Sequence, residues 1–128
     1  MPSIEHMKDV VTAYTTAHSA GDVDAVAALF AEDATVADPV DQPAHQGREA
    51  VRAFFAGTHE MADSMDLHAT GPLRAVGNWV AAPLEAVTKI GDMKLKVDII
   101  DVFTFDEDGL ISDMKAYWTA SDIRPYDG

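Results

Sequence analysis

The chain has 128 residues, which is enough for one domain with a sizeable core, and its composition is that of an ordinary globular protein. Its 22 acidic and 9 basic residues give a formal charge of −13, which disfavours nucleic acid and anionic membrane surfaces as partners. Cysteine is absent, which excludes disulfides, thiol nucleophiles and thiolate metal ligands.

The N-terminus lacks a signal-peptide pattern, and no apolar run approaches membrane-spanning length. We therefore expect a soluble, cytoplasmic protein that does not insert into a membrane.

The first half of the chain predicts three helices. Ser3 can cap a helix that Gly21 stops, and Asp22 can cap a shorter one that extends to Phe30. A third helix is expected to begin at Gly47. Their apolar positions recur at helical spacing, namely Met7, Val10, Val11, Tyr14 and Ala17, then Val23, Val26, Leu29 and Phe30, then Val51, Phe54 and Phe55. Between the last two helices, Ala34–Asp38 predicts a short strand that ends at Pro39.

After the third helix the hydrophobic period changes to two, which predicts a series of strands. The expected strands are 65–69, 73–76, 79–90, 93–105 and 110–120, separated by glycine-containing turns. Pro83 cannot donate to a ladder and therefore predicts a bulge or an edge position. Helices followed by hairpins indicate an α+β fold, a single domain over residues 1–128 with its helices on one face of a strongly bent sheet.

Asp101 is an acid on an otherwise apolar strand face. Alternation places it on one side of the strand 97–105 together with Val97, Ile99, Phe103 and Phe105. A buried carboxylate must be paired or hold its proton, because losing its hydration costs several kcal/mol or more. A neutral carboxylic acid in an apolar wall is a hydrogen-bond donor, which indicates a catalytic pocket. An ordinary core face would be the better interpretation if the acid were absent.

Two further residues become informative beside Asp101. Asp38 shares a face with Ala34 and Val36, although an Asp before Pro is more often a turn former. Tyr14 lies on the apolar stripe of the first helix, where a tyrosine usually only fills the core. Together the three side chains supply one base and two donors.

At this point the sequence resembles the Δ5-3-ketosteroid isomerases of the nuclear transport factor 2-like superfamily. The resemblance spans nearly the whole chain and is carried by Tyr14, residues 21–26, 29–39, 47–49, 70–75, 98–102 and 105–118. It implies an α+β cone that encloses an apolar pocket, with the helices packed on a bent, mixed or antiparallel sheet. It also implies a homodimer, a steroid substrate, and no cofactor or metal.

The resemblance also implies roles for individual residues. Asp38 matches the general base that moves a proton from C4 to C6 of the steroid, while Tyr14 and the protonated Asp101 match the donors to the 3-keto oxygen; this family is a known example of a carboxylic acid kept neutral near pH 7. The matching pocket-wall positions are Leu84, Ile99, Phe103, Met114, Ala116 and Trp118. Phe30 and Phe55 occupy the positions of family tyrosines that form a chain with the catalytic phenol, and they are expected to contact substrate as well.

Other readings stay open. The five histidines, His6, His18, His45, His59 and His68, have no metal-ligand spacing and are predicted to face solvent. Asp106–Gly109 is too short for a calcium loop and predicts a hairpin turn. Rival functions are another enzyme on the same scaffold, such as a polyketide cyclase or an epoxide hydrolase, and a non-catalytic carrier of a hydrophobic small molecule.

Overall fold

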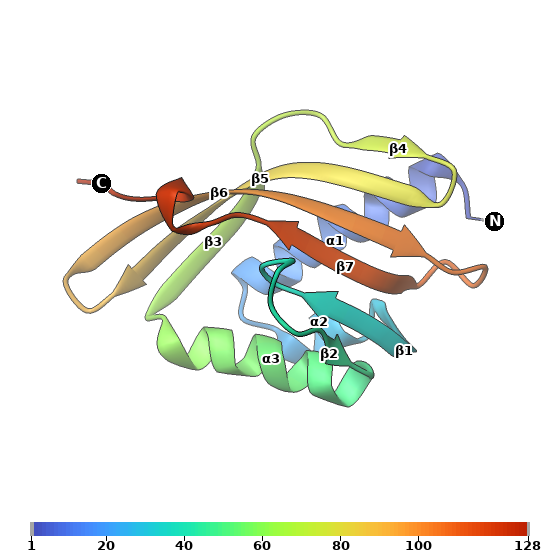
Figure 1. Ribbon diagram of the computed structural model, residues 1–128, viewed down its shortest axis with the longest axis horizontal. Coiled ribbons are helices and arrows are strands. Elements are labelled where there is room, and N and C mark those ends of the chain that lie inside the picture. Colours follow the sequence, from blue (N-terminus) through green and yellow to red (C-terminus); the bar gives the residue numbers. More distant parts are fainter. Residues whose placement is uncertain (1, 128) are drawn as a thin grey trace.

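The computed structural model describes residues 2–127 (Figure 1). The predicted helices and strands follow one another as expected, and two short strands, His45–Gln46 and Ile123–Pro125, were not predicted. The helices are α1 (Ile4–Ser19), α2 (Val23–Ala27) and α3 (Arg48–Met61). The Ser3 hydroxyl accepts a hydrogen bond from the His6 N–H at 3.0 Å, and the Asp22 carboxylate accepts one from the Ala25 N–H at 3.1 Å. Both predicted N-caps are therefore confirmed.

The strands form one mixed sheet in the order β2-β1-β7-β6-β5-β3, with β4 also paired to β5 and β8 to β6. Their bounds are β1 (Phe30–Ala37), β2 (His45–Gln46), β3 (Ser64–Ala69), β4 (Arg74–Val76), β5 (Trp79–Ile90), β6 (Met93–Phe105), β7 (Ile111–Tyr117) and β8 (Ile123–Pro125). The β1–β7 pair is parallel and the others are antiparallel. The predicted α+β architecture is confirmed.

The sheet curls around the helices, with α1 passing behind β5, β6 and β7 in Figure 1 and α3 lying below the strands. A single core fills the space between them, and its largest fully buried side chains include Met7, Phe30, Phe55, Phe103 and Met114. The alternation predicted for β6 is confirmed, because Asp101, Phe103 and Phe105 are buried while Asp98 and Ile100 are exposed.

The structure corrects several predicted boundaries. The second helix ends at Ala27, and Phe30 instead begins β1, because Phe30 pairs with Ile111 of β7 and the Leu29 carbonyl accepts from the Ile111 N–H. The last strand ends at Tyr117, after which Ala120–Asp122 form a short 3₁₀ helix. Here tertiary pairing and local capping override the apolar spacing.

Pro83 occupies the middle of β5, opposite Ile100 of β6, without a register shift in that pair. It lies between the segment paired with β3, which begins at Leu84, and the segment paired with β4, which ends at Ala81. The N–H that Pro83 lacks therefore falls at the point where the neighbour of β5 changes from β4 to β3. The position is a local edge within an interior strand.

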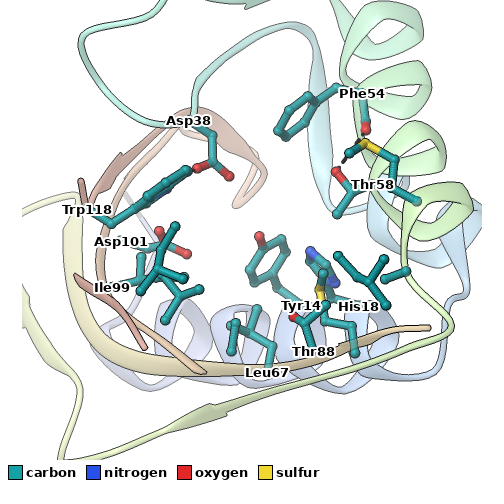
Figure 2. A pocket seen from close by; sticks show the side chains of 17 residues that line it. Tyr14, His18, Asp38, Phe54, Thr58, Leu67, Thr88, Ile99, Asp101 and Trp118 are labelled. Carbon is teal, nitrogen blue, oxygen red and sulfur yellow. Dashed lines mark hydrogen bonds between the residues drawn. The ribbon is translucent and has the colours of Figure 1, made fainter. Parts of the chain in front are cut away.

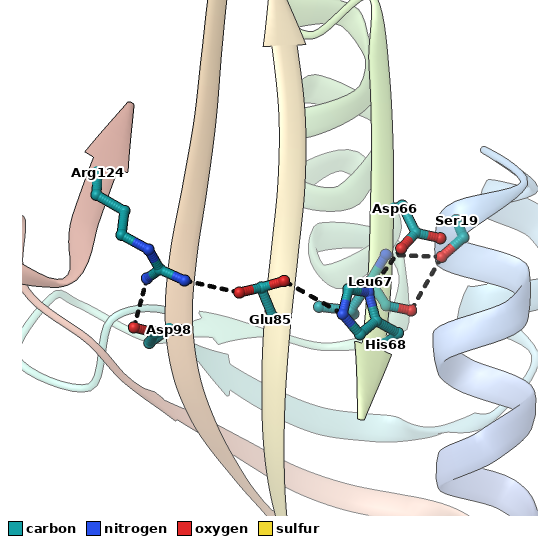
Figure 3. A network of polar contacts seen from close by, with 7 residues as sticks. All are labelled: Ser19, Asp66, Leu67, His68, Glu85, Asp98 and Arg124. Atoms are coloured by element: carbon teal, nitrogen blue, oxygen red, sulfur yellow. Dashed lines mark hydrogen bonds and ion pairs between the residues drawn. The ribbon is translucent and has the colours of Figure 1, made fainter. Parts of the chain in front are cut away.

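Polar contacts connect the C-terminal end of α1 and the last strand, β8, to neighbouring strands of the sheet (Figure 3). The Ser19 hydroxyl accepts from the Leu67 N–H at 2.8 Å and donates to the Leu67 carbonyl at 3.1 Å. On the other side of β5, Arg124 of β8 donates to Asp98 at 2.5 Å and to Glu85 at 2.7 Å. These contacts fix α1 and β8 relative to β3, β5 and β6.

Candidate active site

A cavity of about 330 Å³ lies between the concave face of the sheet and the helices. This size is within the range of small-molecule sites. Its lining residues are Tyr14, His18, Asp38, Phe54, Thr58, Met61, Ala62, Met65, Leu67, Ala86, Thr88, Ile90, Val97, Ile99, Asp101, Trp118 and Ile123. The lining is mainly apolar and contains all three predicted catalytic residues.

The sheet register brings the two acids together. Asp101 of β6 lies opposite Ala116 of β7, and Ala37 of β1 lies opposite Lys115. Asp38 follows Ala37 directly, so both carboxyl groups fall in the same row of the sheet, with the small Ala116 on the strand between them. Figure 2 shows both acids on one side of the cavity, with the Tyr14 hydroxyl pointing into the space beside them.

Asp38 has a hydrogen-bond donor at its carboxylate. The Trp118 indole N–H donates to Asp38 Oδ1 at 2.6 Å. Burial raises the pKa of Asp38, while the Trp118 hydrogen bond and the nearby His45 oppose this rise. The result is a carboxylate that is more basic than an exposed aspartate and is held in a fixed orientation.

Asp101 is only 3% exposed, and its Oδ1 has no hydrogen-bond partner among residues 2–127. Burial, followed by the charge of Asp38, raises the pKa of Asp101 well above its ordinary value. These causes favour the protonated form and leave a carboxylic acid that is able to donate into the cavity.

Tyr14 is 2% exposed, and aromatic rings surround it. Its ring centroid lies 5.4 Å from that of Phe103, 5.8 Å from Phe55 and 6.3 Å from Phe30, all in edge-to-face geometry. Burial, and then Asp101 and Asp38, raise the pKa of Tyr14 well above its usual value, so the phenol keeps its proton. The three phenylalanines position this hydroxyl in the cavity without offering it a polar partner.

The predicted pocket-wall residues divide into two groups. Ile99 and Trp118 line the cavity. Six others are buried and belong to the core that surrounds it, namely Leu84, Phe103, Met114, Ala116, Phe30 and Phe55. Trp118 also contacts Asp38 through its indole N–H, which adds a polar contact to the wall position expected from the resemblance.

The prediction that all histidines face solvent is wrong for His18. This side chain is 5% exposed and lines the cavity beside Tyr14. Its spacing of four residues from Tyr14 places both on one helix face, which is the signal in the sequence that could have identified it. Sequence reasoning also missed Thr58 and Thr88, which line the cavity from α3 and β5.

No group of three or more His, Asp or Glu side chains within residues 2–127 is arranged to hold a metal ion. In the same part of the chain, no helix is long and apolar enough to cross a bilayer.

Comparison with known proteins supports the same family. The model of the SnoaL-like domain matches residues 11–114. A steroid Δ-isomerase of Nocardioides simplex is 38% identical over 117 residues, covering 91% of this chain and 93% of the isomerase.

Two further similar proteins are connected with epoxide chemistry. The epoxide hydrolase LasB of Streptomyces lasalocidi is 26% identical across 98% of this chain, which spans about half (52%) of that protein. A solved structure of SalBIII, an epoxide hydrolase/cyclase-like enzyme with a role in pyran ring formation in salinomycin, superposes with a TM-score of 0.89. It is 30% identical and covers 98% of this chain and 100% of its own.

Proposed function

The chain belongs to the ketosteroid isomerase family of SnoaL-like, nuclear transport factor 2-like proteins, and from this premise we propose that it is a cofactor-independent steroid Δ-isomerase. Its reaction is the conversion of 3-oxo-Δ5-steroids into the conjugated 3-oxo-Δ4 isomers. The observation that supports this most directly is the meeting of Tyr14, Asp38 and Asp101 in one apolar cavity.

Each group has a distinct part in the proposed reaction. Asp38 removes a proton from C4, which is activated because it lies next to the ketone, and the electron pair moves onto the oxygen to give a dienolate. Asp38 then returns the proton to C6, which completes the shift of the double bond. The electrostatic environment suits this task, since burial raises the pKa of Asp38 while Trp118 keeps its carboxylate oriented.

The dienolate oxygen is stabilised by two donors, the Tyr14 phenol and the Asp101 carboxylic acid. Both are buried groups whose raised pKa keeps the proton on the donor. Donors that are fixed before the reaction stabilise the developing charge without reorganisation, and one such donor is typically worth about 2.7–4 kcal/mol. The reaction requires no metal, nucleotide or covalent nucleophile.

Substitution of Asp38 by Asn tests this proposal. We expect Asp38→Asn to lower the turnover of 5-androstene-3,17-dione by at least about 10³-fold, since an amide cannot accept the proton, while binding of the steroid persists. An ultraviolet assay of the conjugated enone measures turnover. His68→Asn, on an exposed side chain outside the cavity, is the control; equal turnover in Asp38→Asn and wild type would exclude Asp38 as the base.

Epoxide opening is the second candidate, favoured by the full-length similarity to SalBIII. In that chemistry one acid protonates the epoxide oxygen and the other activates the attacking hydroxyl, so both carboxyl groups have a use but Tyr14 does not. Tyr14→Phe separates the two. A loss of about 10² to 10³ in steroid isomerisation supports the isomerase, whereas turnover of an epoxy-alcohol that survives this change would support epoxide opening.

The proposal includes a cytoplasmic homodimer. Ile100 and Tyr117, which pair across β6 and β7, are 51% and 47% exposed on the outer face of the sheet, away from the cavity. A second copy that packs on this face would cover them.

A further inference from the structure

The cavity contains polar side chains that the proposed isomerisation does not use. They are His18 from α1, Thr58 from α3 and Thr88 from β5, and the rest of the lining outside the catalytic group is apolar. Thr58 donates its hydroxyl proton to the Phe54 carbonyl at 3.1 Å. His18 is different, because it is almost fully buried and its Nδ1, which has no hydrogen-bond partner within residues 2–127, is enclosed by protein, so that Nε2 is the ring nitrogen able to meet a ligand in the cavity.

The imidazole of His18 is held rigidly by neighbouring rings. Its centroid lies 5.6 Å from Tyr14, 5.4 Å from Phe55 and 4.8 Å from His59. Burial, and then the adjacent His59, lower the pKa of His18 to about 4, so the ring is neutral at physiological pH. A neutral imidazole offers one N–H donor and one acceptor nitrogen, which suits an uncharged hydroxyl or keto group.

The position of His18 along the cavity follows from the fold. Four residues of helix separate it from Tyr14, an axial distance of about 6 Å. The C-terminal end of α1 is fixed to Leu67 by Ser19, and Leu67 lies opposite Ala86 of β5, whereas Asp101 lies opposite Ala82. Both α1 and β5 therefore lead from the ketone-binding group towards the other end of the cavity, and His18 lies one helical turn along this path.

Figure 2 shows the rings of Tyr14 and His18 side by side, with the Tyr14 hydroxyl and a His18 nitrogen directed towards the same open space. A flat tetracyclic ligand whose ring A ketone contacts Tyr14 and Asp101 would place its middle rings, rather than its far end, beside His18.

We propose that His18 hydrogen-bonds to an oxygen substituent on ring B or ring C, so that the preferred substrates are 3-oxo-Δ5-steroids that carry a hydroxyl or keto group on these middle rings. This inference rests on the proposed steroid isomerase function and names the substrate class of that same site. A ligand with only carbon and hydrogen beside His18 would leave the buried imidazole unpaired, and a site of this kind discriminates against such an analogue.

Binding of product-type steroids tests the inference, with the change in intrinsic tryptophan fluorescence as the signal, since Trp118 lines the cavity. The probes are androst-4-ene-3,17-dione and its congeners with one hydroxyl or keto oxygen at C7, C11 or C12, in both hydroxyl orientations. We expect wild-type protein to bind at least one congener about tenfold more tightly than the parent steroid. His18→Phe, which keeps an aromatic ring but lacks nitrogen, should lose this preference.

Two further variants make the result specific. His18→Gln retains a donor and an acceptor near the Nε2 position and should keep part of the preference, and His68→Phe should match wild type because His68 lies outside the cavity lining. A preference that persists in His18→Phe, or wild-type protein that favours no congener, would overturn the inference. Isomerisation of the parent Δ5-steroid is assayed in parallel. Isomerisation without a preference for any oxygenated congener would contradict only the substrate class proposed here. Absence of isomerisation would contradict the isomerase function and this inference with it.

Discussion

At the residue scale, the two carboxyl groups of the cavity have different surroundings, which supports the opposite tasks that we propose for them. Asp38 receives a hydrogen bond from the Trp118 indole, whereas Asp101 is enclosed with an unpartnered oxygen. A hydrogen bond to the charged form favours ionisation, and burial without one favours protonation. These surroundings favour the base and acid roles proposed for the pair, which is the distribution that proton transfer next to a ketone requires.

Removal of the Trp118 donor should change the pH dependence of the reaction. Trp118→Phe keeps an aromatic wall but deletes the hydrogen bond that lowers the pKa of Asp38. We expect the acidic limb of the kcat/KM profile to move to higher pH by roughly one unit, since a hydrogen bond to a charged group is worth about 1.5–3 kcal/mol. Steady-state kinetics from pH 4 to 8 measure the shift, and an unchanged limb would contradict this role of the indole.

The buried Asp101 should lower the free energy of unfolding near neutral pH. The folded chain holds a proton on Asp101 that the unfolded chain, with an ordinary pKa of 3.8, releases. The folded state binds more protons, so the free energy of unfolding falls as pH rises from about 4 to the raised pKa. Asp101→Asn has no proton to lose and should gain stability over wild type by up to about 1.4 kcal/mol per pH unit in this window.

Urea unfolding at pH 5, 6 and 7 checks this gain, and a constant difference between the two proteins would contradict it. In activity, Asp101→Asn still offers an N–H donor and should be milder than Asp101→Leu, for which we expect a loss of about 10² to 10³. Equal losses in both variants would exclude a hydrogen-bonding role.

At the element scale, a charged side chain links the start of α3 to the sheet, beside the hydrogen bond from the Gly47 N–H to the Ala34 carbonyl. Arg48 donates through Nε and Nη2 to the Phe30 carbonyl, at 2.9 and 2.6 Å, which links the first turn of α3 to the first residue of β1. This contact gives Arg48 a structural role at the start of the helix. The preceding Gly47 has a φ of 89°, a conformation that is open mainly to glycine.

Arg48→Met should therefore lower the free energy of unfolding by about 2 kcal/mol, because it leaves the carbonyl of a buried residue without its charged donors. Arg52→Met is the matched control on the same helix. Its ion pair with Asp24 is exposed and should be worth less than about 1 kcal/mol. Urea denaturation compares the two, and similar losses would show that the Arg48 contact has no special weight.

Elements whose local signals agree with their environment could be predicted from the sequence. The two long strands β5 and β6 have the predicted bounds, because alternation and the glycine turn between them point to the same hairpin. The very short strands β2 and β8 have no such signal and depend on neighbours that are distant in the sequence. His18 escaped for the same reason, since its burial comes from Phe55 and His59 of α3.

The meeting of Tyr14, Asp38 and Asp101 was predictable only in part. Alternation identified Asp101 as an acid on a buried face, but their convergence in one cavity was an implication of the family resemblance. The Trp118 hydrogen bond to Asp38 depends on how the chain leaves β7, which no local pattern in the sequence specifies.

At the scale of the whole molecule, the proposed dimer is tested on the outer face of the sheet. Ile100 and Tyr117 form an exposed apolar pair on this face, and Ile100→Lys replaces one member of the pair with a charged residue. We expect it to convert the proposed dimer into a monomer, because a desolvated and unpaired charge in an interface costs several kcal/mol. Sedimentation velocity measures the mass. Val76→Lys, at an exposed apolar position on β4, should remain dimeric; a monomeric wild type would contradict the assembly.

The row formed by Asp38, Ala116 and Asp101 has a mechanical consequence. Asp101 is paired within β6 and Asp38 directly follows the last paired residue of β1, so the ladders of β1, β7 and β6 set the separation of the two acids. We therefore expect their alignment to persist during local opening elsewhere in the domain, as long as these three strands stay paired.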